Sequence, residues 1–485
     1  MEKEVNKSQK SNVPESLTVY IPRNLDIDKI LLNNPPVFNY HRDKFLYIIS
    51  LMYSIPEHLN DFDFERNKGF VPVYATILQG KIHDYKLYLN YLIENGILET
   101  DGKYSHDGGK SYWFRFTQEY SDSNTVPVVI TRYTLIKSIV LRSHPKDKDS
   151  YLPEIPLDAV PYLTKWFNEN LQIDKDRADA ILLDIRDKEL ENPETKDYAK
   201  RKYNIRKISV DKISNREYTL SIDRTSGRFH SPLTRLKTEV RPCISYAGKK
   251  LVSLDLKNSQ PFLSLTLLDI DLYEKNRMQD ILSIYNGRYK NITDRNGNVI
   301  KSPSTIMLED FIRQATNSPE ALDYKNSVVK GTIYEDFALL TGKYGYIPEG
   351  APQSYIDSYN PRKSGKMALF EILFSPNNSP FSERRDGLGY FFNYYGSVYN
   401  VFRLAKQGRR THNALACSLQ YLEAQLILHG VCRIIGEENP DIPLFTIHDS
   451  IITTEEHVDF ILQIMRDVIR DAIGCEPMIK IESWE

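Results

Sequence analysis

Two acidic residues, Asp255 and Asp449, occupy positions from which a carboxylate could face a cleft. Asp255 follows a mostly apolar run, 251–254, which predicts a buried strand that ends at this acid. Asp449 lies between two β-rich runs, 443–447 and 450–454, which predict a tight hairpin with the acid at its tip. Each acid alone has an ordinary explanation, because acids are common at strand ends and in turns. Brought together by the fold, the two carboxylates would suit a hard divalent cation.

A third segment, residues 361–375, carries two cations and then two aromatic rings at intervals of four residues. On a helix this spacing places all four side chains on one face. The arrangement suits a nucleotide, with charges for a triphosphate and rings for the base and sugar. The alternative is an amphipathic core helix with a solvated basic start. The four residues are Arg362, Lys366, Phe370 and Phe374.

In this order, the three segments resemble motifs A, B and C of the family A nucleic-acid polymerases, which include DNA polymerase I and the single-subunit phage RNA polymerases. The family's motif B, R-x3-K-x3-F-x3-[YF]-[GS], is matched from Arg362 to Ser375. Motif C is matched by His448-Asp449, and motif A by Asp255. Weaker similarities to primer- and duplex-contacting segments extend the resemblance over about 225–475.

The resemblance implies an α+β fold, a right-hand polymerase with palm, fingers and thumb. It implies nucleotidyl transfer on a primer-template from nucleoside triphosphates, with two Mg²⁺ ions, or Mn²⁺ as an alternative. The expected metal ligands are Asp255, Asp449 and the backbone carbonyl of Leu256. Nucleotide contacts are expected from the four motif B residues and Gln260. Primer or template contacts are expected from Arg228, Thr234, Arg235, Gln420 and His448.

The sequence also departs from the family pattern. Gln260 stands where the DNA polymerases have a Glu that excludes the ribose 2′-hydroxyl, and its similar bulk favours deoxynucleotides. Glu371 replaces a glycine of motif B. Asp255 and Arg362 are 107 residues apart, which is wider than in DNA polymerase I and indicates insertions at about 270–325 and 344–358. The chain shows no convincing sequence for a proofreading exonuclease.

Three domains are expected: an N-terminal α+β domain over 1–150, a helical, thumb-like region over 151–224, and palm and fingers over 225–485. In the first domain, an apolar helix ends at Asn95-Gly96 and is followed by two strands, 97–100 and 111–116. This order resembles a winged helix, which binds nucleic acid. A small α+β packing module without a ligand is an equal alternative.

Local charge differs from the overall charge. The whole chain has a net charge of −2, but the window 201–250 holds 13 Lys and Arg against 4 Asp and Glu. Such a window favours phosphate backbones, and a solvated basic surface is the alternative. A helical stretch over 162–194 precedes it, after a proline-marked linker at 145–161.

The bulk composition predicts a soluble, cytoplasmic protein. Hydrophobic residues make up 41% and charged residues 26% of the chain, its four cysteines are far apart, and its first residues are polar. No apolar run predicts a membrane span. We expect a template-directed DNA polymerase, such as a phage or mobile element would carry. The alternatives are a single-subunit RNA polymerase or primase-like enzyme, and a non-catalytic replication initiator or regulator with a degenerate palm.

Overall fold

The computed structural model shows a chain that divides into two compact units, each with its own hydrophobic core. Unit 1 comprises 1–148, 173–217 and 235–243, and unit 2 comprises 149–172, 218–234 and 244–485. The structure describes residues 13–58, 62–102, 112–141, 151–340, 360–377, 391–408 and 411–485. The second expected fingers insertion, 344–358, and the start of the expected linker lie outside the described residues.

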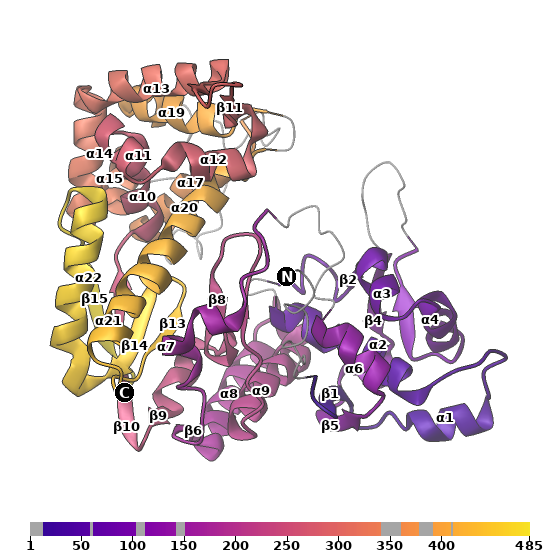
Figure 1. The fold of residues 1–485 in the computed structure, drawn as a ribbon. Coiled ribbons are helices and arrows are strands. Elements are labelled where there is room, and N and C mark those ends of the chain that lie inside the picture. Colours follow the sequence, from indigo (N-terminus) through magenta and orange to yellow (C-terminus); the bar gives the residue numbers. More distant parts are fainter. Residues whose placement is uncertain are drawn as a thin grey trace, which may run out of the picture. The chain divides into compact units, whose positions relative to one another are not determined.

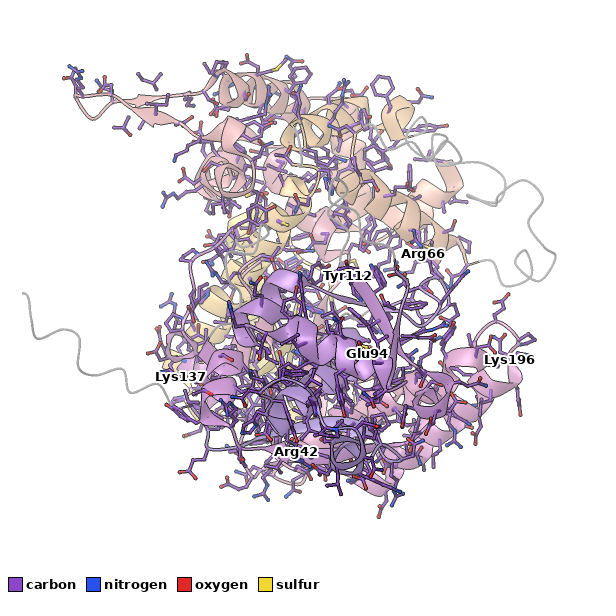
Figure 2. All side chains as sticks on the ribbon, turned by 90° about the vertical axis from the view of Figure 1, so that its right-hand side faces the viewer. Arg42, Arg66, Glu94, Tyr112, Lys137 and Lys196 are labelled. Atoms are coloured by element: carbon purple, nitrogen blue, oxygen red, sulfur yellow. The ribbon has the colours of Figure 1, made fainter. Side chains whose placement is uncertain are left out.

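Unit 1 is built around helix α2 (Arg42–His58), which is buried over most of its length and contributes the centre of the unit's core. Its two-stranded sheet pairs β1 (Leu17–Pro22) with β5 (Thr125–Ile130) in an antiparallel register. Figure 2 labels surface side chains of this unit, among them Glu94 and Tyr112. Its other helices are α1 (Ile27–Asn33), α3 (Ala75–Lys81), α4 (Tyr85–Glu94), α5 (Gln118–Ser121), α6 (Tyr133–Leu141), α8 (Lys175–Glu191) and α9 (Ala199–Ser214).

The helix and ribbon expected in the first domain are confirmed. Helix α4 ends at Glu94, and Gly96 follows with φ 66°, a left-handed backbone that glycine adopts without strain. Strand β3 (Leu98–Thr100) pairs antiparallel with β4 (Tyr112–Phe116), which also pairs with β2 (Val71–Val73). The polar tip between β3 and β4 lies outside the described residues. Nucleic-acid binding by this module stays a prediction.

The helical stretch expected over 162–194 is interrupted. The short helix α7 (Pro161–Thr164) is followed by strand β6 (Leu171–Ile173) before α8 begins. Helices α8 and α9, which we expected in a thumb-like region, belong to the same compact unit as the N-terminal residues. A thumb role for these helices stays a prediction.

Unit 2 contains a sheet with the strand order β13-β14-β10-β9-β6, and β15 also pairs with β10. Strand β10 (Lys249–Leu256) lies between β14 (Ser450–Thr454) and β15 (Ile479–Ser483), antiparallel to both. Strand β13 (Phe445–Ile447) completes a hairpin with β14. The remaining strands are β7 (Ser221–Ile222), β8 (Phe229–His230), β9 (Ile244–Tyr246), β11 (Ile292–Thr293) and β12 (Val299–Ile300).

Helices make up the rest of unit 2. Figure 1 shows α13, α14 and α19 gathered at one end of this unit and the sheet strands at the other, with α20 running between them. The helices are α10 (Ser259–Leu263), α11 (Ile270–Lys275), α12 (Met278–Tyr285), α13 (Pro303–Thr316), α14 (Pro319–Val329), α15 (Ile333–Leu340), α17 (Pro361–Phe374), α19 (Gly396–Ala405), α20 (Ala414–Ala424), α21 (Arg433–Glu438) and α22 (Val458–Ile473). A π-helical stretch, Gln425–Cys432, joins α20 to α21.

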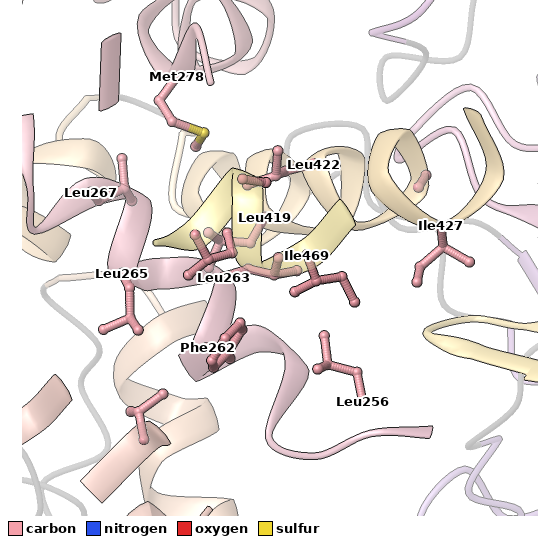
Figure 3. Packing of buried hydrophobic residues seen from close by; sticks show 14 of the residues in the cluster. Leu256, Phe262, Leu263, Leu265, Leu267, Met278, Leu419, Leu422, Ile427 and Ile469 are labelled. Carbon is pink, nitrogen blue, oxygen red and sulfur yellow. The ribbon is translucent and has the colours of Figure 1, made fainter. Parts of the chain in front are cut away.

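The core of unit 2 connects the end of β10 to these helices. Leu256, the last residue of β10, is buried in the same cluster as Phe262 of α10 and Leu419 of α20 (Figure 3). Because α10 starts three residues after β10 ends, the apolar side chains of both elements hold the intervening turn in place. No described helix is both long and apolar enough to cross a lipid bilayer.

Candidate active site

The two carboxylates singled out in the sequence lie on neighbouring elements of one sheet. Asp255 is the next-to-last residue of β10 and is partly exposed between the buried residues Leu254 and Leu256. Its partner across the antiparallel pairing is Ser450, the residue that directly follows Asp449. The Ser450 Oγ hydroxyl donates a hydrogen bond to Asp255 Oδ1. The expected strand end and hairpin are therefore confirmed, and they are adjacent in space.

Asp449 and His448 form the two-residue tip of the β13–β14 hairpin. His448 has φ 54°, whereas Asp449 has an ordinary negative φ, the pattern of signs found in a type II′ turn. Asp449 is partly exposed. Burial, followed by the negative charges of Glu423 and Asp255, raises the pKa of Asp449, and a hydrogen bond from Ser259 acts in the opposite direction. Ionisation of Asp449 is therefore less favourable here than at an isolated exposed aspartate.

Glu423 of α20 is a third carboxylate at this position. It is 1% exposed, and burial raises its pKa, against ion pairing with Arg228 and a hydrogen bond from Gln260. Arg228 Nε and Nη2 donate to Glu423 Oε1 at 2.8 and 2.5 Å. Gln260 Nε2 donates to the other oxygen, Oε2, at 2.6 Å. Glu423 thus connects the segment before β10 with the helix that follows it.

Helix α17 contains the expected motif B residues, and its first turn contacts the turn after β10. Asn360 caps the helix by accepting a hydrogen bond from the Lys363 N–H. Arg362 Nη1 pairs with Glu335 of α15 at 2.6 Å, and Nη2 donates to Asn258 Oδ1 at 3.2 Å. Because Asn258 is three residues after Asp255, this hydrogen bond joins the segment of the first carboxylate to the cationic helix.

The remaining motif B side chains differ in their exposure. Lys366 is exposed, and its Nζ lies 5.2 Å from the Phe370 ring centroid. The Phe370 and Phe374 rings are 5.1 Å apart, edge to face, and both are half-buried against the core of unit 2. The four side chains thus lie on one face of α17, as expected. The two rings also pack against the core, as in the alternative of an amphipathic core helix. Lys406 holds the end of α17 by donating to the Ile372 and Ser375 carbonyls at 2.5 and 3.0 Å.

Asp255 and Asp449 offer the hard oxygen donors that a divalent cation such as Mg²⁺ prefers. Across the described ranges, Arg228 is the only cation in ion-pair contact with Asp255, Asp449 or Glu423, and it pairs with Glu423. Asp255 and Asp449 thus have no cation partner among the described residues, and a metal ion would offset their charge. Among the described side chains, no three His, Cys, Asp or Glu converge as a complete metal cluster. A bound ion would need further oxygens, such as the Leu256 carbonyl, water and phosphate.

The expected primer and template residues fall in different surroundings. Arg228 is in unit 2 and is paired with Glu423, as described above. The Thr234 hydroxyl is buried and bonds the Ser231 carbonyl at 2.6 Å, whereas Arg235 belongs to unit 1. Gln420 is half-exposed on α20, and the His448 ring lies 6.2 Å from that of His230. The structure therefore groups Arg228 and His448 with the carboxylates, and contact with nucleic acid stays a prediction for all five.

The basic window 201–250 is largely neutralised within the fold. Seven of its 13 cations pair with acids outside the window: Lys202 with Glu65, Arg206 with Glu189, Lys207 with Asp179, Lys212 with Glu57, Arg228 with Glu423, Lys249 with Glu456 and Lys250 with Glu485. The count of charged residues in the window could not include these acids, because they are distant in the sequence. The window is therefore not a free phosphate-binding surface over its whole length.

Comparisons with known proteins find a distant likeness in structure alone. No protein-family model matches the chain, and no curated protein matches its sequence. Among solved structures, the chain is similar to the POL domain of Pol1 from M. smegmatis, solved as a complex with a DNA primer-template and dNTP. The alignment covers 66% of this chain and 68% of that one, with 11% sequence identity and a TM-score of 0.37. A likeness this distant does not show the family.

Sequence reasoning missed Glu423, Asn258 and Ser259, although all three contact expected site residues. Asn258 and Ser259 directly follow the first carboxylate, but a turn gives no sign of which partners its side chains will meet. Glu423 left a clearer signal. It is the only charged residue in α20, whose other residues are mostly apolar. A lone acid in a buried helix requires a partner, since an unpaired buried charge is costly.

Proposed function

We propose that this chain is a template-directed nucleotidyl transferase of the right-hand polymerase type, with a palm built on the β13–β14–β10 sheet. The observation that carries the proposal is the convergence of three segments far apart in sequence. Strand pairing and the Ser450–Asp255 hydrogen bond join the two carboxylate segments. The Arg362–Asn258 hydrogen bond adds the cationic helix. A fold that held these segments for packing alone would have no need to place beside them two carboxylates that pair with no described cation.

Each group has a specific part in this proposal. Asp255, Asp449 and the Leu256 carbonyl would hold Mg²⁺, which when bound stabilises the attacking and leaving oxygens of an in-line displacement. Arg362 and Lys366 would bind the triphosphate and offset the charge that develops on the departing pyrophosphate.

The remaining site residues would position the reactants. The half-buried Phe370 and Phe374 rings would present a face to the sugar and base, and aromatic faces accept any base. Arg228, which donates to Glu423 through Nε and Nη2, would offer its remaining N–H groups, two on Nη1 and one on Nη2, to a primer phosphate.

The preferred product is DNA, because Gln260 has the bulk to restrict the ribose 2′ position. RNA synthesis is the second candidate, since the His448-Asp449-Ser450 sequence resembles the RNA-polymerising branch as much as the DNA branch. Ser450 is in contact with Asp255, so the feature that the two branches share lies within the site. Extension of a labelled primer on DNA and RNA templates with either dNTPs or NTPs separates the candidates.

The test of the proposal is nucleotide incorporation by Asp255→Asn and Asp449→Asn variants with Mg²⁺. We expect each to lower the rate at least 100-fold, as the loss of other preorganised electrostatic groups does. Duplex binding and melting temperature should change little, because both side chains are partly exposed. The matched control is Asp459→Asn, the same change at an exposed position in the first turn of α22. Near-normal extension by either site variant would overturn the proposal.

A further inference from the structure

Strands β11 and β12 form an antiparallel ribbon that lies between α12 and α13 in the chain. Ile292 pairs with Ile300, and Thr293 pairs with Val299. Figure 1 shows β11 at the end of unit 2 where α13 and α19 gather, and in Figure 2 the ribbon projects from that end. It belongs to 270–325, where the sequence indicated an insertion, so the resemblance to the polymerases assigns it no role. Residues 288–301 are called the arm below.

The arm presents apolar side chains to solvent instead of to a core. Ile292, Val299 and Ile300 are 68%, 65% and 53% exposed, and none of them packs against either hydrophobic cluster. Because Ile292 and Ile300 are direct cross-strand partners, their side chains lie on the same face of the ribbon. Single exposed apolar residues are ordinary on a protein surface, whereas an adjacent group of them with polar neighbours is typical of an interaction site.

The base of the arm is fixed to the helices on both sides of it. Asn291 donates to Gln279 Oε1 of α12 at 2.9 Å and accepts from the Ser302 N–H at 3.1 Å. Lys301 donates to both carboxylate oxygens of the buried Glu309 of α13, each at 2.7 Å. A two-stranded hairpin is marginally stable on its own, so these bonds at its base help to hold it in place. The apolar pair is thus kept in solvent by a fixed support.

The charge that the arm leaves unpaired is positive. The arm holds 4 Lys and Arg against 1 Asp. That acid, Asp294, closes the tip by accepting hydrogen bonds from the N–H and Nδ2 of Asn298 at 2.8 and 2.9 Å. Arg288, Lys290 and Arg295 are exposed and form no ion pair within the described ranges. The arm therefore suits a partner that is both anionic and able to contact apolar side chains.

Duplex nucleic acid has both properties. Its phosphates attract exposed Lys and Arg, and its major groove admits a two-stranded β-ribbon. Apolar side chains such as isoleucine can be inserted between base steps, which unstacks them. A product duplex leaves the site with its base pairs intact, whereas a duplex ahead of the site must be opened before its template strand can be copied. The isoleucine pair therefore fits the duplex ahead of the site.

We propose that the arm binds duplex nucleic acid ahead of the proposed active site and separates its strands, with Ile292 and Ile300 placed against the first base pair. Arg288, Lys290 and Arg295 bind the phosphates of that duplex. The inference rests on the nucleotidyl-transferase function proposed above and adds strand separation to it. The arm and the site belong to the same compact unit, so the chain can open the duplex and copy it without a separate protein.

The test compares primer extension on a single-stranded template with extension on the same template carrying an annealed downstream strand. The ratio of the second rate to the first measures strand displacement. The variant carries both Ile292→Ser and Ile300→Ser. We expect its ratio to fall about tenfold, since unstacking a base step costs more free energy than a tenfold change in rate represents. Extension on the single-stranded template should stay near the wild-type rate, because no strand has to be separated there.

Two further variants separate this role from general damage. Leu322→Ser is the matched control on α14, where the side chain is 52% exposed, and it should leave the ratio unchanged. Lys290→Gln with Arg295→Gln should weaken the binding of a forked duplex and lower the slope of log affinity against log salt by about 2, one for each lost phosphate contact. An unchanged slope would contradict the phosphate contacts. Melting temperatures should match the wild type, because every replaced side chain is exposed.

The outcomes also separate this inference from the proposed function. Absence of extension by the wild-type chain on every template overturns both. Extension on the single-stranded template without displacement by the wild-type chain overturns strand separation alone, and so does an equal loss of both rates in the isoleucine variant. Unchanged displacement by that variant also overturns it. If sedimentation then shows that the variant has lost a self-association of the wild type, a second copy of the chain covers the arm instead.

Discussion

The three carboxylates of the candidate site have different partners, which indicates that they have different roles. Glu423 is fully buried and is neutralised by Arg228, so its charge is used within the protein. Asp255 and Asp449 are partly exposed and accept hydrogen bonds from hydroxyl groups, which bring no positive charge. Carboxylates that are partly exposed and pair with no cation of the described ranges are available to a ligand. The division separates a structural acid from two acids that could act on a substrate.

Asp223 organises the loop that carries Arg228, and its role is testable by pH. Its carboxylate accepts hydrogen bonds from the Ser226 and Arg228 N–H groups and lies 3.2 Å from His230 Nε2. Burial alone would raise the pKa of Asp223, but hydrogen bonds from His230 and Ser226 outweigh it and hold the pKa at about 2. We expect Asp223→Asn to lower the free energy of unfolding at pH 6 by about 2 kcal/mol.

Because the pKa of Asp223 is lowered by folding, its contribution is complete above the unfolded value near 4 and is lost as pH falls toward 2. Urea unfolding of the wild-type chain and of Asp223→Asn should therefore give curves that differ at pH 6 and converge as pH falls from 4. Asp310→Asn is the control, since that carboxylate is exposed on α13. A difference in stability that stays constant from pH 6 to pH 3 would contradict the assignment.

At the scale of elements, the position of α17 depends on a close approach to α15 at Gly365. A Cβ atom added there would lie 1.9 Å from the Tyr334 carbonyl oxygen, a distance that no packing tolerates. The Arg362 guanidinium also lies over the Tyr334 ring, with its Cζ atom 5.2 Å from the ring centroid. Glu335, the residue after Tyr334, pairs with Arg362. The contact at Gly365 therefore sets the position of Arg362, the cation that we propose binds the triphosphate.

Gly365→Ala should separate the two helices. Alanine favours a helix over glycine by about 1 kcal/mol, but the clash with backbone atoms should cost more, for a net loss of about 1–3 kcal/mol in unfolding free energy. We also expect a raised KM for the nucleotide, because Arg362 moves with α17. The control is Met367→Ala on the same helix, where the side chain is 64% exposed. Thermal melting and incorporation kinetics measure both effects, and an alanine variant as stable as the wild type would show that the helices do not pack this closely.

The elements of the site could be predicted from sequence because their signals are local. Two β-rich runs on either side of a turn predicted the hairpin around Asp449, and a four-residue repeat predicted α17. The contacts of Glu423 and Gly365 could not be predicted, because both depend on residues from other elements. The same limit explains the basic window, where a count over 50 neighbouring residues omitted the acids that neutralise it. Local patterns thus identify candidate groups for chemistry, whereas long-range packing decides how each group is oriented or neutralised.

At the scale of the whole molecule, the two units have separate hydrophobic clusters that share no residue. All residues to which we assign chemistry belong to unit 2. Four cations of the basic window lie on α9 of unit 1 and pair with acids of that unit. If these cations serve the folding of unit 1, their loss should affect stability. If they serve nucleic-acid binding, their loss should reduce duplex affinity and its dependence on salt.

Lys212 separates these two roles, because its ammonium forms the most buried ion pair of α9. Lys212 Nζ donates to both oxygens of Glu57 at 2.8 and 2.7 Å, and the Glu57 side chain is 3% exposed. Lys212→Met leaves that carboxylate without its bonded cation, so we expect unit 1 to lose about 3 kcal/mol of stability. The double variant Glu57→Gln, Lys212→Met should recover part of the loss, since no buried charge then remains.

Calorimetry of Lys212→Met should show an unfolding transition at lower temperature than in the wild type. Nucleotide incorporation at 25 °C should be retained, because the proposed site lies in the other unit. Reduced duplex affinity with an unchanged transition temperature would instead assign Lys212 to a nucleic-acid surface.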